Sequence, residues 1–282
     1  MNQMMVAQIY VDDIVFGGVS NQQVKQFVHQ MEAKFEMSMV GELKYFLGIQ
    51  IRHMEDNIFI SQLNYGKNIV NKFGLEYAKP KKTPFAIHVK VTKDEIGKSI
   101  DVSGYRSMIG SLLYLTESRH DIAHSVGVCA RYQADPKESH LNFVKRVIKY
   151  VQGTSDYGLL YTFDTNGSLV GYCDADWAGN TDDRKSTSGG CLFFRNNLVS
   201  WFSKKQNSVS LSIAEAEFIA AGSSCTQLLW MKQILEKYGV NLVVDLEHVS
   251  TDKKVADIFT KGLDVNQFEY LRTALGLYVF EI

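Results

Sequence analysis

The chain has 282 residues, a length that predicts about two domains, and 45% of them are hydrophobic, which suffices for an ordinary globular core. It has no secretory signal pattern and no apolar run long enough to span a bilayer, so we expect an intracellular protein, cytoplasmic or nuclear, without membrane association. Four dispersed cysteines lack the spacing of a zinc site and are expected to be buried or free thiols in a reducing compartment.

The net charge of −1 conceals an uneven distribution along the chain. Residues 1–60 carry a net charge of −3, residues 61–153 carry +7, and residues 154–282 carry −5. This asymmetry indicates acidic metal sites towards both ends and a basic middle segment that contacts the phosphates of a nucleic acid. The alternative is an unevenly charged surface that is merely solvated.

Two neighbouring carboxylates, Asp12 and Asp13, interrupt an apolar, strand-like segment near the start of the chain. Such a pair is costly in apolar surroundings unless a cation compensates the charges. Mg²⁺ takes oxygen ligands, so a strand–turn–strand with Asp-Asp at its tip is a candidate two-metal phosphoryl-transfer site. The alternative is an ordinary solvated turn.

Local signals predict regular elements over the first half of the chain. Ser20 followed by Gln23 is a capping box for a helix, and Gly74 is a helix-ending residue. The predicted elements are a helix from Ser20 to Phe35, strands over Leu43–Arg52 and Ile58–Ser61, a helix over Leu63–Phe73, a linker over Lys79–Pro84 and helices over 103–152. Three basic residues, Lys145, Arg146 and Lys149, lie on or near the polar side of the last helical segment.

From about Thr154 onwards, predicted strands alternate with predicted helices, which favours an α/β domain. Ser212 and Glu215 form a second capping box, and Asn196-Asn197 predicts a type I′ hairpin turn. The predicted elements are strands over Leu169–Cys173, Gly190–Arg195, Leu198–Ser203 and Leu242–Val249, a helix from Ser212 through Ala221, and helices over Thr226–Tyr238, Val255–Lys261 and Gln267–Leu275.

Several motifs in one order resemble Ty1/copia-type retrotransposon Pol polyproteins, specifically the C-terminal part of the reverse transcriptase and the ribonuclease H domain. Gln8–Gly17 looks like the catalytic hairpin and Glu42–Ile49 like the primer grip. The segments that resemble the ribonuclease H domain are Gly171–Gly179, Asp183–Gly189, Ala214–Phe218 and Ala256–Leu263.

The resemblance implies an α/β (α+β) fold: a partial reverse transcriptase palm over 1–78, a helical thumb or connection over 79–153, and a ribonuclease H-like domain over 154–282. The parent protein would copy RNA into DNA and degrade the RNA of the hybrid, using two Mg²⁺ ions at each centre. Its partner would be a primer–template duplex or an RNA–DNA hybrid, held in part by Lys145, Arg146 and Lys149.

By resemblance, Asp174, Glu217 and Asp257 match three of the four metal-binding carboxylates of ribonuclease H. Asp176 is expected to be a supporting acid and Glu215 a helix cap. The remaining ligand should belong to an Asp-Asn pair between Glu217 and Asp257, but the sequence has none there. We therefore expect an internal deletion near 239–242. Asp245 is the only nearby acid that could replace this missing ligand. Its neighbours match a later strand of the family, which argues against that role.

The polymerase centre is also expected to be incomplete, because the family takes a third aspartate from an earlier palm strand and this sequence starts eleven residues before Asp12. Asp12 and Asp13 alone cannot clamp two metal ions. We therefore expect a chain that is catalytically incomplete at both centres. The alternatives are a non-catalytic nucleic-acid-binding module and a gene relic without a selected role.

Overall fold

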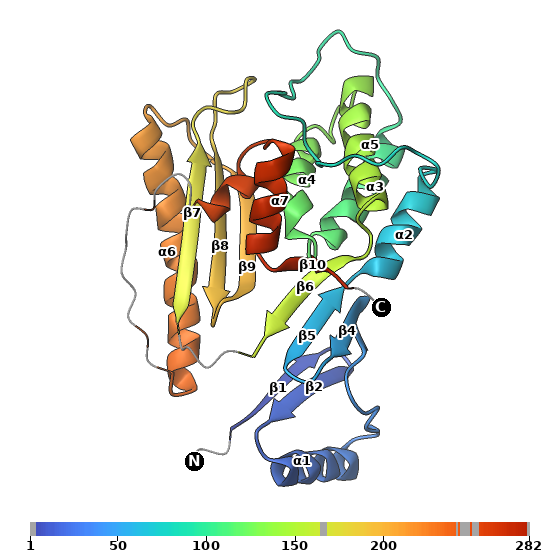
Figure 1. Ribbon diagram of the computed structural model, residues 1–282, viewed down its shortest axis with the longest axis vertical. Coiled ribbons are helices and arrows are strands. Elements are labelled where there is room, and N and C mark those ends of the chain that lie inside the picture. Colours follow the sequence, from blue (N-terminus) through green and yellow to red (C-terminus); the bar gives the residue numbers. More distant parts are fainter. Residues whose placement is uncertain (1–3, 164–167, 241, 243–248, 250–253, 281–282) are drawn as a thin grey trace. The chain divides into compact units, whose positions relative to one another are not determined.

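The computed structural model describes residues 4–163, 168–240, 242, 249 and 254–280 (Figure 1). The chain divides into two compact units, Met1–Leu47 and Gly48–Ile282. The domain boundaries predicted near residues 78 and 153 lie inside the second unit and do not coincide with this division.

The first unit is a hairpin followed by a helix. Strand β1 (Met5–Tyr10) pairs antiparallel with β2 (Asp13–Gly18), helix α1 spans Asn21–Lys34, and a short strand β3 covers Tyr45–Phe46. The Ser20 hydroxyl accepts a hydrogen bond from the Gln23 backbone at 3.4 Å, which confirms the predicted cap. No residue between 4 and 47 is buried, so this unit has no core within itself.

The second unit begins with antiparallel strands from distant parts of the chain. In the order β10-β6-β5-β4, they are β10 (Leu277–Val279), β6 (Tyr157–Thr162), β5 (Asn57–Ser61) and β4 (Ile49–His53). Neither β6 nor β10 was predicted from the sequence. β6 pairs with β5, and β10 pairs with β6, so this sheet joins stretches that the sequence assigned to different domains.

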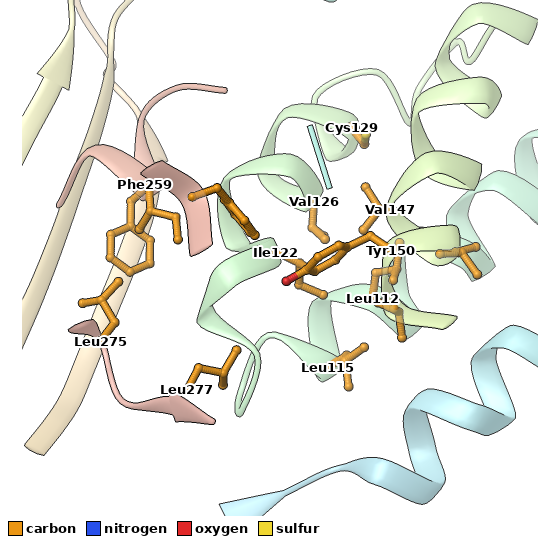
Figure 2. Close-up of a cluster of buried hydrophobic side chains, with 14 of the residues drawn as sticks. Leu112, Leu115, Ile122, Val126, Cys129, Val147, Tyr150, Phe259, Leu275 and Leu277 are labelled. Atoms are coloured by element: carbon orange, nitrogen blue, oxygen red, sulfur yellow. The ribbon is translucent and has the colours of Figure 1, made fainter. Parts of the chain in front are cut away.

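The predicted helices of the middle segment are confirmed. They are α2 (Leu63–Lys72), α3 (Val102–Leu115), the 3-10 turn η1 (His120–Ile122), α4 (Ala123–Ala130) and α5 (Glu138–Gln152). Their apolar faces bury Leu112, Ile122 and Val147 in one core (Figure 2). Phe259 and Leu275 from near the C-terminus belong to the same core, so the middle and C-terminal segments fold together.

A second sheet carries the C-terminal motifs. Strands β7 (Leu169–Asp176), β8 (Thr187–Phe194) and β9 (Asn197–Lys205) pair antiparallel in that order. Helix α6 (Ile213–Lys237) packs along β7 and β8, followed by the 3-10 turn η3 (Val255–Phe259) and α7 (Val265–Ala274) (Figure 1). The described part of the chain is therefore mixed α/β, as predicted.

Two local predictions need correction. The two helices predicted between Ser212 and Tyr238 form one continuous helix, α6, because Gly222 in its middle weakens a helix without breaking it. The hairpin turn lies one residue earlier than predicted, since Arg195 and Asn196 have the positive φ angles (51° and 62°) that a type I′ turn requires. The predicted strand over Leu242–Val249, with Asp245, falls largely outside the described residues.

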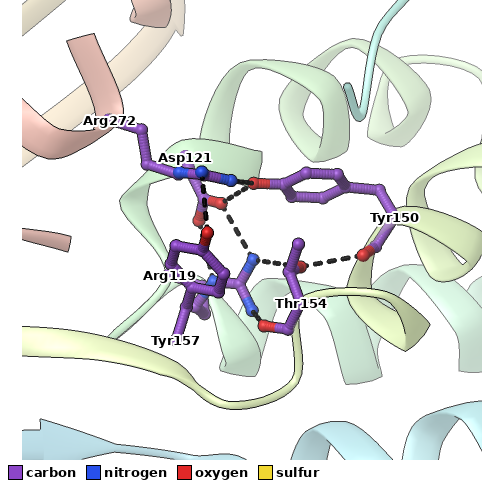
Figure 3. A network of polar contacts seen from close by, with 6 residues as sticks. All are labelled: Arg119, Asp121, Tyr150, Thr154, Tyr157 and Arg272. Atoms are coloured by element: carbon purple, nitrogen blue, oxygen red, sulfur yellow. Dashed lines mark hydrogen bonds and ion pairs between the residues drawn. The ribbon is translucent and has the colours of Figure 1, made fainter. Parts of the chain in front are cut away.

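A buried polar network ties the core together (Figure 3). Arg119 is 2% exposed and forms a two-pronged ion pair with Asp121, with N–O distances of 2.9 and 2.8 Å. Tyr150 donates to the same carboxylate, and Arg272 from α7 donates to the Tyr150 hydroxyl at 3.1 Å. The network therefore joins η1, α5 and α7.

Every helix in the described residues is too short or too polar to cross a lipid bilayer.

Candidate functional site

Three predicted site residues come from three different elements of the second unit. Asp174 lies near the end of β7, Glu217 in the first turns of α6, and Asp257 in η3. The side chains of Asp174 and Asp257 are almost fully buried, with residue exposures of 3% and 2%, and Glu217 is partly exposed. The fold therefore places two of these acids inside the protein rather than on its surface.

A glycine explains how β7 and η3 approach each other. Asp174 pairs with Gly189 of the neighbouring strand β8. A Cβ atom at Gly189 would lie 2.6 Å from the Phe259 Cβ atom and 2.8 Å from the Thr260 methyl group, so η3 packs directly on that backbone. Thr260 then donates a hydrogen bond to the Asp174 carboxylate. The glycine thus permits the close packing that brings Asp174 and Asp257 into one cluster.

The start of α6 is held as the sequence predicted. The Ser212 hydroxyl accepts from the Glu215 backbone at 3.1 Å, while the Glu215 carboxylate accepts from the Leu211 backbone at 2.6 Å. Glu215 is therefore a helix cap, as expected. These two hydrogen bonds fix the first turn of α6, from which Glu217 extends towards Lys254.

Two lysine ammonium groups link the three acids. Lys254 Nζ lies 3.3 Å from Glu217 Oε1 and 3.6 Å from Asp174 Oδ1. Lys261 Nζ lies 2.7 Å from Asp257 Oδ2 and 3.8 Å from Asp174 Oδ2. Asp174 is thus bridged to each of its two partners by an ammonium group. We call Asp174, Glu217, Asp257, Lys254 and Lys261 the acid–lysine cluster.

The electrostatics of the cluster follow from burial and from these neighbours. Burial raises the pKa of Asp257, and the nearby Asp174 carboxylate adds to this effect, although Lys261 opposes it. Burial opposes the charge on Lys254, but Glu217 and Asp174 outweigh it and raise the pKa of Lys254. In the described part of the protein, the second oxygen of Asp257, Oδ1, has no hydrogen-bond partner.

The cluster has the donor chemistry of a site for a hard cation, because it offers carboxylate oxygens and one of them is buried without a partner. Within the described residues, however, no three His, Cys, Asp or Glu side chains are grouped so that they hold one metal ion. The lysines provide the positive charge that compensates these acids.

Asp176, expected to be a supporting acid, lies two residues beyond Asp174 on β7. Its carboxylate accepts a hydrogen bond from the Thr187 backbone. Burial raises the pKa of Asp176 to about 6, and Asp174 contributes to the rise, against the effects of Thr187 and Arg131.

Asp12 and Asp13 lie at the tip of the β1–β2 hairpin, and both are exposed. Val11, in the turn, has a φ of 50°, an unfavourable angle for a β-branched residue. The hairpin itself is confirmed, whereas a metal site at its tip stays a prediction.

The three basic residues predicted to hold nucleic acid all lie on α5 and are partly buried. Arg146 donates to the Thr83 hydroxyl at 3.0 Å, and the Lys149 carbonyl accepts from the Lys81 backbone at 3.2 Å. Burial lowers the pKa of Arg146. The segment around Thr83 therefore packs against this helix, and Arg146 has a structural partner there.

Sequence reasoning missed Lys254, Lys261 and a cleft of about 420 Å³ beside the cluster. Lys254 lies just before the motif around Asp257, and Lys261 lies within it. Lys261 follows Asp257 by four residues, and this spacing was a usable sequence signal for the ion pair. The cleft had no local signal, because residues 85–91 reach β7 and β8 only through the tertiary fold.

Comparisons with known proteins identify the chain's relatives. Residues 1–87 match the family model described as reverse transcriptase (RNA-dependent DNA polymerase). The chain is 36% identical over 226 residues to the uncharacterized mitochondrial protein AtMg00810 of Arabidopsis thaliana, covering 80% of this chain and 94% of that protein. No solved structure matches the chain.

Two transposon proteins are also similar. The retrovirus-related Pol polyprotein from transposon RE2 of Arabidopsis thaliana is 34% identical over 83% of this chain, and the chain spans 16% of it. The corresponding polyprotein from transposon TNT 1-94 of Nicotiana tabacum is 32% identical over 98% of this chain, in an alignment of 328 positions that spans 25% of the polyprotein. The chain therefore belongs to the copia-type, retrovirus-related Pol polyproteins of transposons, and corresponds to a small part of the full-length members.

Proposed function

We propose that this chain is a Pol fragment that binds an RNA–DNA hybrid or primer–template duplex and has little or no polymerase or ribonuclease H turnover. Residues 154–282 would derive from the ribonuclease H domain, and the preceding segments from the reverse transcriptase. The observation that carries the proposal is the acid–lysine cluster, in which Lys254 and Lys261 bridge the three candidate ligands at 2.7–3.8 Å.

Asp174, Glu217 and Asp257 are the acids that the resemblance assigns to Mg²⁺, although in the described residues they are not grouped as three ligands of one ion. When bound in pairs at such sites, Mg²⁺ stabilises the attacking and leaving oxygens of phosphoryl transfer. In this chain the two ammonium groups already compensate the carboxylates, and burial favours the neutral form of Asp257. A cation must therefore compete with Lys254 and Lys261, which predicts weak metal binding.

An internal deletion agrees with the length of one alignment. The alignment with the TNT 1-94 polyprotein has 328 positions, 46 more than the residues of this chain. The relative therefore contains residues that this chain lacks, and the sequence predicts the gap near 239–242, where an Asp-Asn ligand pair is missing. Loss of a ligand and of its strand would further reduce hydrolysis.

Nucleic-acid binding would depend on the basic middle segment, residues 61–153, with its net charge of +7. Binding through phosphates releases counterions, so the affinity should fall steeply as salt concentration rises. Because Arg146 is held by Thr83, we expect Lys145 and Lys149 to contribute more to this affinity than Arg146 does.

The test uses the full chain, a fluorescently labelled RNA–DNA hybrid and Mg²⁺, with binding and RNA cleavage measured in parallel. We expect salt-dependent binding, weakened in a Lys145→Ala/Lys149→Ala variant, with little or no cleavage. The matched control is Lys237→Ala, which changes an exposed lysine at the end of α6, outside residues 61–153. Rapid Mg²⁺-dependent cleavage that disappears in Asp174→Asn would show an active ribonuclease H and overturn the proposal.

A further inference from the structure

A cleft of about 420 Å³ lies beside the acid–lysine cluster and shares Lys261 with it. Thr260, which donates to Asp174, also lines the cleft. Its walls come from residues 85–91, helix α4, the facing ends of β7 and β8, and residues 260–263. A volume of this size is within the range of small-molecule sites in proteins.

Residues 85–91 form a wall that is fixed at both ends. Phe85 is buried, with its ring stacked on Phe143 at 6.0 Å between centroids. Val91 is buried, and its carbonyl accepts from the Tyr132 hydroxyl at 2.8 Å. Between these anchors His88 and Lys90 are exposed. The cleft is therefore preformed, and a cationic side chain stands on its outer wall.

Arg131 supplies a positive charge inside the cleft, where Asp176 balances it only in part. It is partly buried and donates to the Thr187 hydroxyl at 2.9 Å. Among the residues that the structure describes, no carboxylate lies within 4.0 Å of its guanidinium group, and burial lowers the pKa of Arg131. Lys90 adds positive charge to the lining, whereas the ammonium group of Lys261 is already paired with Asp257 and Asp174. The acid in the described lining is Asp176. An anionic group of a ligand would satisfy Arg131.

The rest of the cleft suits an aromatic, hydrogen-bonding ligand. Val128 and Leu263 are buried apolar residues in its lining, and Trp177 is 47% exposed with its indole N–H fixed on the Ser210 carbonyl at 3.2 Å. His124 is 6% exposed, and its Nδ1 atom has no partner in the described part of the chain. A buried nitrogen of this kind calls for a ligand N–H or O–H group.

We propose that this cleft binds a single nucleotide unit, with its phosphate at Arg131 and Lys90, its base on the apolar wall beside Trp177, and one of its donor groups on His124 Nδ1. A nucleotide has a group for each of these features: a phosphate for the cationic side chains, a base for the apolar wall and a donor for His124. Inorganic phosphate lacks the base, and a fatty acid lacks the aromatic ring and its donor groups. The proposal goes beyond hybrid binding, since it involves neither a metal ion nor cleavage.

The test is a titration of the full chain in EDTA, followed by tryptophan fluorescence and calorimetry. The probes are AMP, adenosine, inorganic phosphate and a four-residue oligoadenylate. We expect AMP to bind more tightly than adenosine or phosphate. Arg131→Met should weaken AMP binding by at least about tenfold, because a charge-assisted hydrogen bond is lost. Arg106→Met, which changes an exposed arginine outside the cleft, should leave it unchanged.

Lys90→Ala is a second variant, and because Lys90 is exposed, this substitution should leave the folding of the chain intact. It should weaken AMP binding by a few fold. Equal affinity for AMP and inorganic phosphate would overturn the proposal, as would binding of the oligonucleotide without AMP, or AMP binding that neither variant changes. Hybrid binding is assigned to Lys145 and Lys149, which do not line the cleft, and EDTA prevents metal-dependent cleavage, so failure here is distinct from failure of either.

Discussion

Two pairs of aspartates, one in each unit, show how differently the same residue type is used in this protein. Asp12 and Asp13 lie exposed at the tip of a hairpin. Asp174 and Asp257 are almost fully buried and linked through Lys261. The first pair belongs to the more conspicuous sequence motif, but only the second pair is buried and surrounded by charged partners. A recognisable motif therefore does not imply that its side chains are held in a buried, partnered site.

The contrast follows from the packing around each pair. The first unit has two paired strands and one helix, with no buried residue between positions 4 and 47, and an isolated hairpin is marginally stable in water. Asp174 instead lies on an edge of the sheet β7-β8-β9 that α6 and η3 cover. Buried charges require partners, and Lys254 and Lys261 provide them.

The largest predicted effect contrasts a buried acid with an exposed one. Asp121→Ala should lower the free energy of unfolding by about 3–5 kcal/mol, because it leaves the Arg119 guanidinium buried without its carboxylate. Asp12→Ala, in the first unit, should change it by less than about 0.5 kcal/mol. Urea denaturation followed by tryptophan fluorescence measures both. Similar losses in the two variants would contradict the contrast between the units.

A glycine substitution tests the packing that forms the acid–lysine cluster. Gly189→Ala should destabilise the protein by about 1–3 kcal/mol, because the new methyl group would overlap Phe259 and Thr260 and displace η3. The matched control is Gly110→Ala in α3, where a Cβ meets no atom within 4 Å and helix propensity favours alanine. A neutral Gly189→Ala variant would mean that η3 does not pack on β8 as described.

The smallest predicted effect is a pH dependence from a buried histidine. Burial lowers the pKa of His120 to about 4, whereas it is 6.5 in a model peptide. The folded state therefore favours neutral His120, so its contribution to stability is complete above pH 6.5 and is lost as the pH falls towards 4. Between pH 7 and pH 5.5 this loss is roughly 1 kcal/mol.

Urea denaturation at both pH values, for the native chain and for His120→Leu, isolates this contribution. Burial lowers the pKa of His124 to about 3, which acts in the same direction, while the raised pKa of Asp176 acts in the opposite one. Both effects are common to the two proteins and cancel in the difference. His29→Gln, at an exposed position, is the control. An unchanged pH dependence in His120→Leu would refute the assignment.

Local signals predicted most of the helices and hairpins, because caps and turns depend on neighbouring residues. Ser20, Ser212 and Gly74 are examples, and Gly74 has a φ of +64° after α2. The pairing of β5 with β6 joins residues about 100 positions apart, and no local pattern specifies it. The motifs likewise predicted Asp174, Glu217 and Asp257, but not the lysines between them, because ion-pair geometry depends on how η3 packs against β7.

Metal binding to the acid–lysine cluster tests most directly whether the two ammonium groups compete with a divalent cation. The measurement is a titration with Mn²⁺, as a spectroscopic substitute for Mg²⁺, followed by electron paramagnetic resonance in the native chain, in Lys261→Met and in Lys254→Met/Lys261→Met. We expect weak binding to the native chain and binding at least about tenfold tighter in the double variant, since removing both charges frees the carboxylates. Equal affinities in all three proteins would contradict this competition.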